Sequence, residues 1–369
     1  MSDVPHLRFP EFTGEWKKYR LDEMGESFIG LTYSPKDVVE NEGTIVFRSS
    51  NIQNGQIDYS DIVRVSKTIK ERIITRENDL LICARNGSPR LIGKNALIKK
   101  TDANNTFGAF MMVYRSIDND FIHPLLSTRR YVSQVGENLG ARINQITTSD
   151  LNSFEFFFPK NDGEKRKIGK LFDLLNERIA TQNKIIDKLK SLIKGLAVAL
   201  TTKGKPNTAI SQCLECHSSA LQESEVIPNG LYKVFGANGL VGYTDVPQMN
   251  GDAILVIKDG SGVGTVFYAQ GKFSAIGTLS YLTVIGNNDL RYLYFALSVF
   301  NFQAYKTGMA IPHIYFKDYG KAKIYCPPFA EQKHIANALD KLESKLLLEQ
   351  GILASFNWQK RYLLGQMLI

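Results

Sequence analysis

The sequence predicts a mixed α+β protein in which two pseudo-symmetric, strand-rich domains alternate with two long helices that pair as an antiparallel coiled coil. Three observations lead to this prediction. The chain has 369 residues, more than one hydrophobic core usually serves. An apolar heptad pattern occurs twice, and short motifs before each heptad pattern also recur. The ordinary share of hydrophobic residues, 43%, excludes global disorder.

The predicted order is a first domain over residues 1–159, a helix over 160–203, a second domain over 204–330 and a second helix over 331–369. Within the domains, β-branched runs are broken by Gly-containing turns, as at Asn54-Gly55 and Asn238-Gly239. We therefore expect both domains to be built from short strands.

The domains share motifs at a nearly constant spacing. The strand-like run 79–85, before Asn-Gly-Ser, resembles the run 252–258, before Asp-Gly-Ser. At an offset of 168, Gly140, Ile143, Ile146, Asp150 and Pro159 match Gly308, Ile311, Ile314, Asp318 and Pro327. Chance predicts roughly one such match over this stretch, so the pattern indicates an internal duplication.

The two helices carry apolar residues at alternating steps of four and three, which is an a/d heptad seam. In the first helix the seam is Ile168, Phe172, Leu175, Ile179, Gln182, Ile186, Leu189, Ile193, Leu196 and Leu200. In the second it is Ile335, Leu339, Leu342, Leu346, Glu349, Leu353, Phe356, Lys360, Leu363 and Met367. A core-facing surface helix is the alternative for either seam, but two matched seams favour pairing with each other.

Polar residues interrupt both seams at their midpoints. An antiparallel arrangement places Gln182 opposite Glu349, and we predict that this pair sets the register of the helices. Each helix is also expected to begin at a glutamate, Glu164 or Glu331, because a carboxylate stabilises the positive end of the helix dipole.

The formal charge of +8 is concentrated in one segment. Residues 160–205 hold twelve Lys and Arg against five Asp and Glu, whereas residues 1–159 hold twenty of each. The basic side chains flanking the first seam are Lys165, Arg166, Lys167, Lys170, Lys184, Lys188, Lys190 and Lys194. This surface is predicted to face phosphates or an acidic partner, with a solvated helix face as the alternative.

No export signal or apolar run long enough to span a membrane is recognisable, which favours a cytoplasmic protein with free thiols. Cys213-Leu-Glu-Cys216-His217 fits a c-type haem attachment pattern, but it has neither that context nor a second ligand pair for zinc. We therefore expect Cys213 and Cys216 to be buried thiols, and we predict no metal or cofactor in this chain.

Catalytic motifs are incomplete. The Gly260-Ser-Gly-Val-Gly264 run leads into a β-like segment rather than a helix, which predicts a turn instead of a nucleotide loop. Cys326-Pro-Pro-Phe329 resembles the Asn-Pro-Pro-Tyr/Phe motif of adenine methyltransferases, but Cys326 replaces the residue that holds the amine. No Ser-His-Asp arrangement follows from the spacing. The chain is predicted not to be an enzyme.

Taken together, these residues resemble the specificity subunit of type I restriction-modification systems. The N-terminal Leu7-Arg-Phe-Pro-Glu-Phe12 and the Pro327-Pro-Phe-Ala-Glu-Gln-Lys-His-Ile-Ala336 run before the second seam are similar to family motifs, and the duplication covers the whole chain. The resemblance implies two target-recognition domains, each reading half of a split double-stranded DNA site. It also implies paired helices that fix the domain separation and dock two methyltransferase subunits. S-adenosylmethionine, Mg and ATP would then reside on the methyltransferase and restriction subunits.

Base reading in the major groove requires side chains that match the donor and acceptor patterns of base edges. Candidates cluster at predicted turns, where a solvated loop or turn-forming role is the alternative for each. In the first domain they are Asn51, Gln53, Arg85, Asn86, Arg90, Arg142, Asn144 and Gln145; in the second they are Asn238, Lys258, Asp259, Ser261, His313 and Tyr315.

Two other functions fit parts of the same pattern. A stand-alone interaction scaffold would use the duplicated helices for docking and the domains for binding protein. A fused methyltransferase is disfavoured by the missing motifs.

Overall fold

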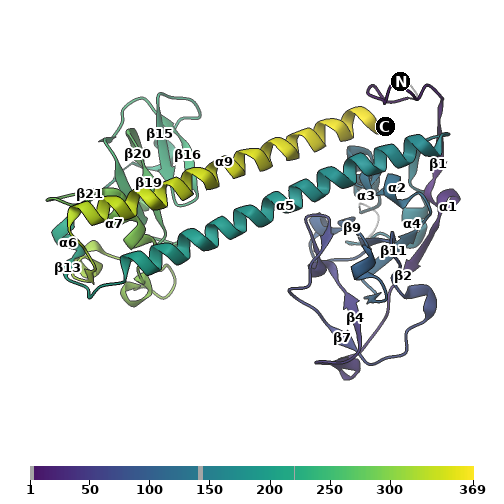
Figure 1. Ribbon diagram of the computed structural model, residues 1–369, viewed down its shortest axis with the longest axis horizontal. Coiled ribbons are helices and arrows are strands. Elements are labelled where there is room, and N and C mark those ends of the chain that lie inside the picture. The colour runs from purple at the N-terminus through teal and green to yellow at the C-terminus, as the bar shows by residue number, and fades with distance from the viewer. Residues whose placement is uncertain (1–3, 140–143, 220) are drawn as a thin grey trace. The chain divides into compact units, whose positions relative to one another are not determined.

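Each repeat of the sequence folds into small β-sheets, as seen in a computed structural model that describes residues 4–139, 144–219 and 221–369 (Figure 1). The chain forms two units, one of residues 1–183 with 351–369 and the other of residues 184–350. The predicted mixture of strand-rich domains and long helices is confirmed.

In the first unit, two four-stranded sheets carry most of the strands that the structure describes. Their orders are β2-β11-β8-β9 (Glu26–Ile29, Met111–Arg115, Leu80–Cys83, Asn95–Leu97) and β10-β4-β7-β3 (Thr106–Phe107, Thr44–Phe47, Arg64–Val65, Val38–Val39). Two-stranded pairs join β1 (Trp16–Arg20) to β12 (Glu155–Pro159) and β5 (Ile52–Gln53) to β6 (Gln56–Ile57). The short helices are α1 (Leu21–Met24), α2 (Asn119–Leu125), α3 (Arg129–Leu139) and α4 (Thr148–Ser153).

The second unit repeats this plan. Its four-stranded sheets are β14-β21-β18-β19 (Leu214–Ser218, Leu279–Val284, Ala253–Ile257, Val266–Ala269) and β16-β15-β20-β17 (Gly239–Thr244, Tyr232–Gly236, Lys272–Ala275, Met249–Asn250). A two-stranded pair joins β13 (Thr208–Ala209) to β22 (Lys323–Ile324). The helices are α6 (Ile210–Cys213), α7 (Leu290–Ser298) and α8 (Phe316–Tyr319).

Strand β8 lies centrally in its sheet and is buried on both faces, which explains its unbroken apolar sequence. Leu80 and Ile82 face a core that contains α2 and parts of the long helices, whereas Leu81 and Cys83 face a core between the two sheets. In β18, Ile254 takes the side that Leu80 takes in β8.

The structure corrects the sequence alignment of these strands by one residue. The amide of Ile146 donates to the carbonyl of Ala84, and the amide of Ile314 donates to the carbonyl of Lys258, both at 2.9 Å. Arg85 therefore corresponds to Asp259 and not to Lys258. With this correction, corresponding residues of the two strands face corresponding cores, whereas the uncorrected alignment paired residues on opposite faces, because successive strand residues point to opposite sides.

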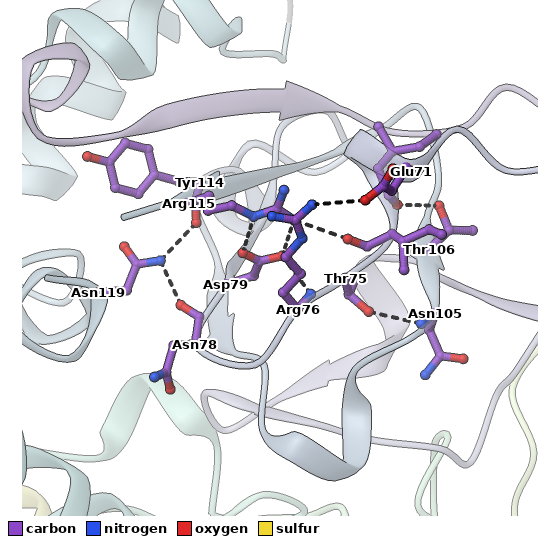
Figure 2. Close-up of polar contacts among 12 residues, drawn as sticks. Glu71, Thr75, Arg76, Asn78, Asp79, Asn105, Thr106, Tyr114, Arg115 and Asn119 are labelled. Carbon is purple, nitrogen blue, oxygen red and sulfur yellow. Dashed lines mark hydrogen bonds and ion pairs between the residues drawn. The ribbon is translucent and has the colours of Figure 1, made fainter. Parts of the chain in front are cut away.

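A buried ion pair anchors the start of β8 (Figure 2). Arg115 donates from Nε and Nη2 to the two carboxylate oxygens of Asp79, at 2.8 and 2.7 Å, and Asp79 is 1% exposed. The Arg115 guanidinium also donates to the carbonyl of Ile74, while Asn119 Nδ2 donates to the carbonyls of Asn78 and Tyr114. This bidentate pairing fixes β8, and with it the turn that follows the other end of the strand.

The long helices α5 (Asp162–Thr201) and α9 (Phe329–Met367) begin and end within two residues of the predicted ranges. In the first unit the start of α5, at Ile168 and Phe172, shares a core with the end of α9, at Leu364 and Met367. In the second unit the end of α5, at Ala197, shares a core with Ile335 and Leu339 at the start of α9. Opposite ends therefore meet in both units, as expected for antiparallel helices.

The seam residues differ in burial. The α5 members Ile168, Phe172, Leu175, Ile179, Gln182, Ile186 and Leu189 are buried, as are Ile335 and Leu339 of α9. Met367 of α9 is buried as well. The half-buried seam members are Leu342, Leu346, Glu349, Leu353, Phe356, Lys360 and Leu363 of α9 and Ile193, Leu196 and Leu200 of α5. The predicted pairing of Gln182 with Glu349 stays a prediction.

The N-terminal motif has a structural role in the first unit. Arg8 binds both carboxylate oxygens of Glu164, at 2.8 and 2.7 Å, and the amide of Leu7 donates to the carbonyl of Gln366 in α9. Glu164 thus lies in the first turn of its helix, as predicted. No helix within the described ranges combines the length and apolarity that membrane crossing requires.

Candidate functional site

A cleft of about 990 Å³ in the first unit collects three of the predicted DNA-reading residues, Arg85, Asn86 and Asn144. Its lining also includes Tyr33, Arg48, Ser49, Ser50, Asp61 and Phe110. The lining residues come from six separate stretches of the chain, between Leu31 and Asn144, so the cleft exists only in the folded domain.

The turn after β8 is joined to the segment before α4 by a backbone bridge. Arg85 pairs with Gln145 as an isolated antiparallel bridge, and the amide of Asn86 donates to the carbonyl of Asn144 at 3.3 Å. Asn144 has a φ of 51°, a conformation that Asn adopts more readily than most residues, and its Nδ2 donates to the carbonyl of Gly87. Four predicted residues therefore lie together.

Arg85 presents an exposed positive charge at this bridge. Its guanidinium carbon lies 5.2 Å from the ring centroid of Phe110, and Phe110 is itself 59% exposed. The Arg85 and Ala84 amides both donate to the carbonyl of Phe110. The aromatic ring thus supports the guanidinium at the mouth of the cleft.

Asn86 links this turn to the opposite wall. Its Nδ2 donates to Ser49 Oγ at 3.0 Å, while its Oδ1 accepts from the amide of Ser88. Arg48, beside Ser49, forms an ion pair of 2.6 Å with Asp61. Sequence reasoning missed Arg48 and Phe110, although Arg48 lies only three residues before the candidate Asn51.

The base-reading prediction for Asn51 is corrected by the structure. Asn51 is fully buried, its Oδ1 accepts from the amide of Arg48, and its Nδ2 donates to the carbonyls of Asp58 and Asp61. The side chain is fully used in holding the turn, because Asn can mimic a backbone partner.

Two other first-domain candidates, Gln53 and Arg90, are not part of the cleft lining. Gln53 is exposed in β5 and donates to the carbonyl of Ser50. Arg90 is exposed in a short 3₁₀ turn, Pro89–Leu91. Arg142 lies outside the described residues.

The second unit has a matching bridge with different side chains. Asp259 pairs with His313, and the amide of Gly260 donates to the carbonyl of Pro312 at 2.9 Å. His313 packs edge-on against Tyr315 with ring centroids 5.0 Å apart, and Tyr315 is 48% exposed. Lys258 precedes the bridge and exposed Ser261 follows it. Asn238 is separate from this group, at the tip of the β15–β16 turn.

A second groove adjoins the first-unit cleft. It has a volume of about 390 Å³, shares Leu31 and Thr32 with the cleft and is lined by the cations Lys67, Lys70 and Arg72. Lys67 donates to the carbonyl of Thr32 and pairs with Asp37. Cations beside this cleft suit a polyanion whose backbone passes the groove.

The remaining motifs take structural positions. Val266–Ala269 follows the Gly260–Gly264 turn as strand β19, as predicted. His217 stacks on Tyr281 and shares a hydrogen bond with Thr283 Oγ1. Cys213 is buried and Cys216 half-buried. In the part of the chain that the structure describes, no three His, Cys, Asp or Glu side chains are grouped to hold a metal.

The comparisons with known proteins agree with one another. The family model of the type I restriction modification DNA specificity domain matches residues 13–191 and 215–356. The type I restriction enzyme StySPI specificity subunit of Salmonella potsdam is 24% identical over 225 residues, which cover 57% of this chain and 48% of that protein. The EcoKI specificity subunit of Escherichia coli is 25% identical over 173 residues, covering 45% and 37%. The matches thus span about half or less of these curated relatives.

Solved structures share the fold. The type I restriction-modification S subunit from M. genitalium superposes with a TM-score of 0.70 at 18% identity, covering 99% of both chains. A chain from a study of the assembly of the type I R-M system gives a TM-score of 0.51 at 15% identity, covering 98% and 99%.

Proposed function

Because the chain belongs to the family of type I restriction modification DNA specificity domains, we propose that it is the sequence-specific DNA-binding subunit of a type I restriction-modification complex. The observation that carries this proposal is the repeated bridge: Arg85 with Gln145 in one domain and Asp259 with His313 in the other. Each bridge presents polar side chains at the same point of a duplicated fold. Each domain then reads one half of a bipartite site.

The side chains at the two bridges predict different half-sites. Arg85 is a donor suited to guanine, and Asn86 and Gln145 suit adenine, whereas Asp259 is an acceptor suited to the amine of cytosine. Lys67, Lys70 and Arg72 would contact phosphates beside the first cleft. The target is therefore asymmetric, with an unread spacer between its halves.

The paired helices would hold the two domains apart and dock two methyltransferase subunits. Restriction subunits would join the same complex. S-adenosylmethionine, Mg and ATP would be bound by those partners, and this chain would contribute no catalytic residue. The basic face of α5 supports a role in meeting phosphates or an acidic surface.

A domain exchange tests the proposal. Residues 1–159 are replaced by the matching domain of another family member, and the modified adenines are mapped after co-expression with the methyltransferase subunits. One half of the target should change while the other half stays. Simultaneous change of both halves would contradict independent reading by two domains.

Copurification separates this function from a protein scaffold. The DNA-binding subunit should copurify with methyltransferase subunits and confer sequence preference on them. A chain that binds them without altering where they methylate would instead be a docking scaffold.

A further inference from the structure

Two of the four cysteines lie together in the second unit, on elements that are far apart in sequence. Cys213 ends α6, and Cys326 lies between β22 and α9. The elements are held together by the antiparallel pairing of Thr208 with Ile324. Asn207 clamps the Cys326 backbone, since its Nδ2 donates to the Cys326 carbonyl and its Oδ1 accepts from the Cys326 amide, both at 2.8 Å.

The two thiols belong to the same apolar cluster, in which Cys213 is a core member and Cys326 packs against the core. Cys213 Sγ lies 3.5 and 3.3 Å from the carbonyl oxygens of Ala209 and Ile210. Cys213 is fully buried, whereas Cys326 is half-buried and interacts with the Thr208 hydroxyl. Proximity of two thiols on restrained segments is the starting geometry that a disulfide requires.

Their surroundings make the two sulfurs chemically unequal. A side-chain interaction with Cys213 lowers the pKa of the Cys326 thiol, while the same interaction and burial raise the pKa of Cys213. A more acidic, more accessible thiol beside a buried partner is the arrangement of a peroxide-reactive cysteine and its resolving cysteine.

The first repeat has no thiols at these positions. Arg20 pairs with Glu155 as Ala209 pairs with Lys323, and α1 follows β1 as α6 follows β13. Counting from these pairs, Met24 corresponds to Cys213 and Phe158 to Cys326, and both side chains belong to an apolar core. Two apolar side chains are therefore sufficient to pack this part of the domain. The thiols at the same positions of the second repeat add chemical reactivity that packing alone does not require.

We propose that Cys213 and Cys326 form an oxidation site that hydrogen peroxide converts into an intrachain disulfide. The Cys326 thiolate attacks one peroxide oxygen, the O–O bond breaks, and the departing hydroxide takes a proton to leave as water. Cys213 Sγ then attacks the sulfur of the Cys326 sulfenic acid. The S–O bond breaks, and the hydroxide leaves with the Cys213 proton as a second water. Two thiols lose two electrons, and one peroxide becomes two waters.

The disulfide would tie the start of the second domain to the segment that enters α9. It closes a long loop, which restricts the unfolded chain and raises Tm. A dithiol reductant would reverse both the bond and the rise in Tm.

The test is peptide mapping of the full chain after treatment with equimolar hydrogen peroxide. Mass spectrometry without reductant should find the peptides of Cys213 and Cys326 joined, with the loss of two hydrogens and release by dithiothreitol. A C83S/C216S variant, which keeps only this pair, should give the same cross-link. Absence of the cross-link, or a cross-link that involves Cys216 instead, would overturn the proposal.

Single variants test the division of roles. C213S should accumulate a sulfenic acid at Cys326 that dimedone traps, whereas C326S should give no dimedone adduct at the buried Cys213. An adduct at Cys213 in C326S at an equal rate would contradict the assignment. Circular dichroism checks the fold of both variants. If either variant unfolds, the wild-type chain provides the test. Peroxide should then block iodoacetamide labelling of both Cys213 and Cys326, and dithiothreitol should restore it; labelling that peroxide does not block would overturn the proposal.

Discussion

The bridge of the first repeat joins Arg85 to Gln145, whereas that of the second joins Asp259 to His313. The backbone arrangement is the same in both, down to the amides that donate across it. In the first repeat the ring of Phe110 lies beside Arg85, and the Phe110 carbonyl accepts from the amide of Ala84. In the second repeat the carbonyl of Thr278 takes this place and accepts from the amide of Lys258. The two repeats therefore share the backbone hydrogen bonds of the bridge and differ in the side chains that the bridge exposes.

The anchors of the two central strands differ as well. In the first repeat the buried Asp79–Arg115 pair fixes the start of β8. In the second, Asp252 precedes β18 and accepts from Tyr268 Oη and the amide of Gly271 while it remains exposed. The first strand thus depends on a buried charge pair and the second on solvated hydrogen bonds.

Substitution at these anchors has the largest expected effect. Asp79→Ala leaves the Arg115 guanidinium without its carboxylate and should lower the free energy of unfolding of the first unit by about 3 kcal/mol. The change Asp252→Ala, at the acidic residue that directly precedes β18, should cost about 1 kcal/mol, because water replaces the lost partners. Denaturant unfolding with hydrogen exchange on β8 and β18 measures both. Equal losses would remove the distinction between the two anchors.

Arg85→Ala tests the first bridge as a reader of bases. If Arg85 binds one base in bidentate fashion, DNA binding should weaken by about 2 kcal/mol and one position of one half-site should relax. Binding to a panel of single-base target variants measures this, with Asp259→Ala as the counterpart in the other half-site and Arg90→Ala as a control outside the cleft. A loss that is uniform across the panel would indicate a phosphate contact.

The first unit also contains a pH-sensitive side chain, His123. Burial, and to a smaller extent the charge of Lys360, lower the pKa of His123 to about 4 from the ordinary 6.5. Counted from the helix N-caps Asp118 and Asp289, the matching residue in α7 is Tyr294, which donates to Glu343 instead.

His123 should therefore destabilise the first unit in acid. Only the unfolded chain takes up this proton between pH 6.5 and about 4, so stability is full above that window and falls by about 2 kcal/mol across it. Urea unfolding at several pH values measures the slope, and His123→Gln should flatten it. Burial raises the pKa of the Asp120 carboxyl, which makes the folded state take up a proton more readily in acid and so opposes the effect of His123. Asp120 is present in both the wild-type chain and the His123→Gln variant. An unchanged slope would assign the acid sensitivity elsewhere.

Substitution at the midpoints of the long helices should change the free energy of unfolding by a smaller amount. Replacing Gln182 and Glu349 together by Leu should raise the free energy of unfolding by about 1 kcal/mol, because apolar residues pack at a seam without a desolvation cost. Thermal unfolding measures the change, and the two single variants serve as controls. A marked loss of stability in the double variant would contradict the predicted role in register.

The basic face of α5 should give the smallest change. Reversing Lys184 and Lys188 to Glu should reduce the dependence of DNA binding on salt by about two counterions if both side chains face phosphates. The same reversal at Lys341 and Lys345 of α9 is the matched control. An unchanged salt dependence would assign this face to a protein partner.

Much of the fold could be predicted because periodic patterns specify it locally. The heptad seams indicated both long helices to within two residues, and recurring motifs indicated the duplication. The strand alignment was one residue out, because apolar residues occupy both faces of β8 and β18 and leave no alternation to fix the phase.

The candidate site was less predictable from sequence. Arg85, Asn86, Asn144 and Gln145 were predicted as separate turn residues, and only the bridge brings them together. Asn51 has the same residue type and turn context as Asn86, yet it is buried and fully hydrogen-bonded within the fold. Residue type cannot distinguish these outcomes, since they depend on which distant segment covers the side chain.

The sequence by itself determined the duplication, the two helices and the family, because these reside in spacing and local motifs. Tertiary structure alone decided which turns form the cleft, that Phe110 supports Arg85, and that Cys213 and Cys326 belong to one apolar cluster. These contacts join residues far apart in the chain, and their geometry follows from how the sheets pack rather than from any local pattern.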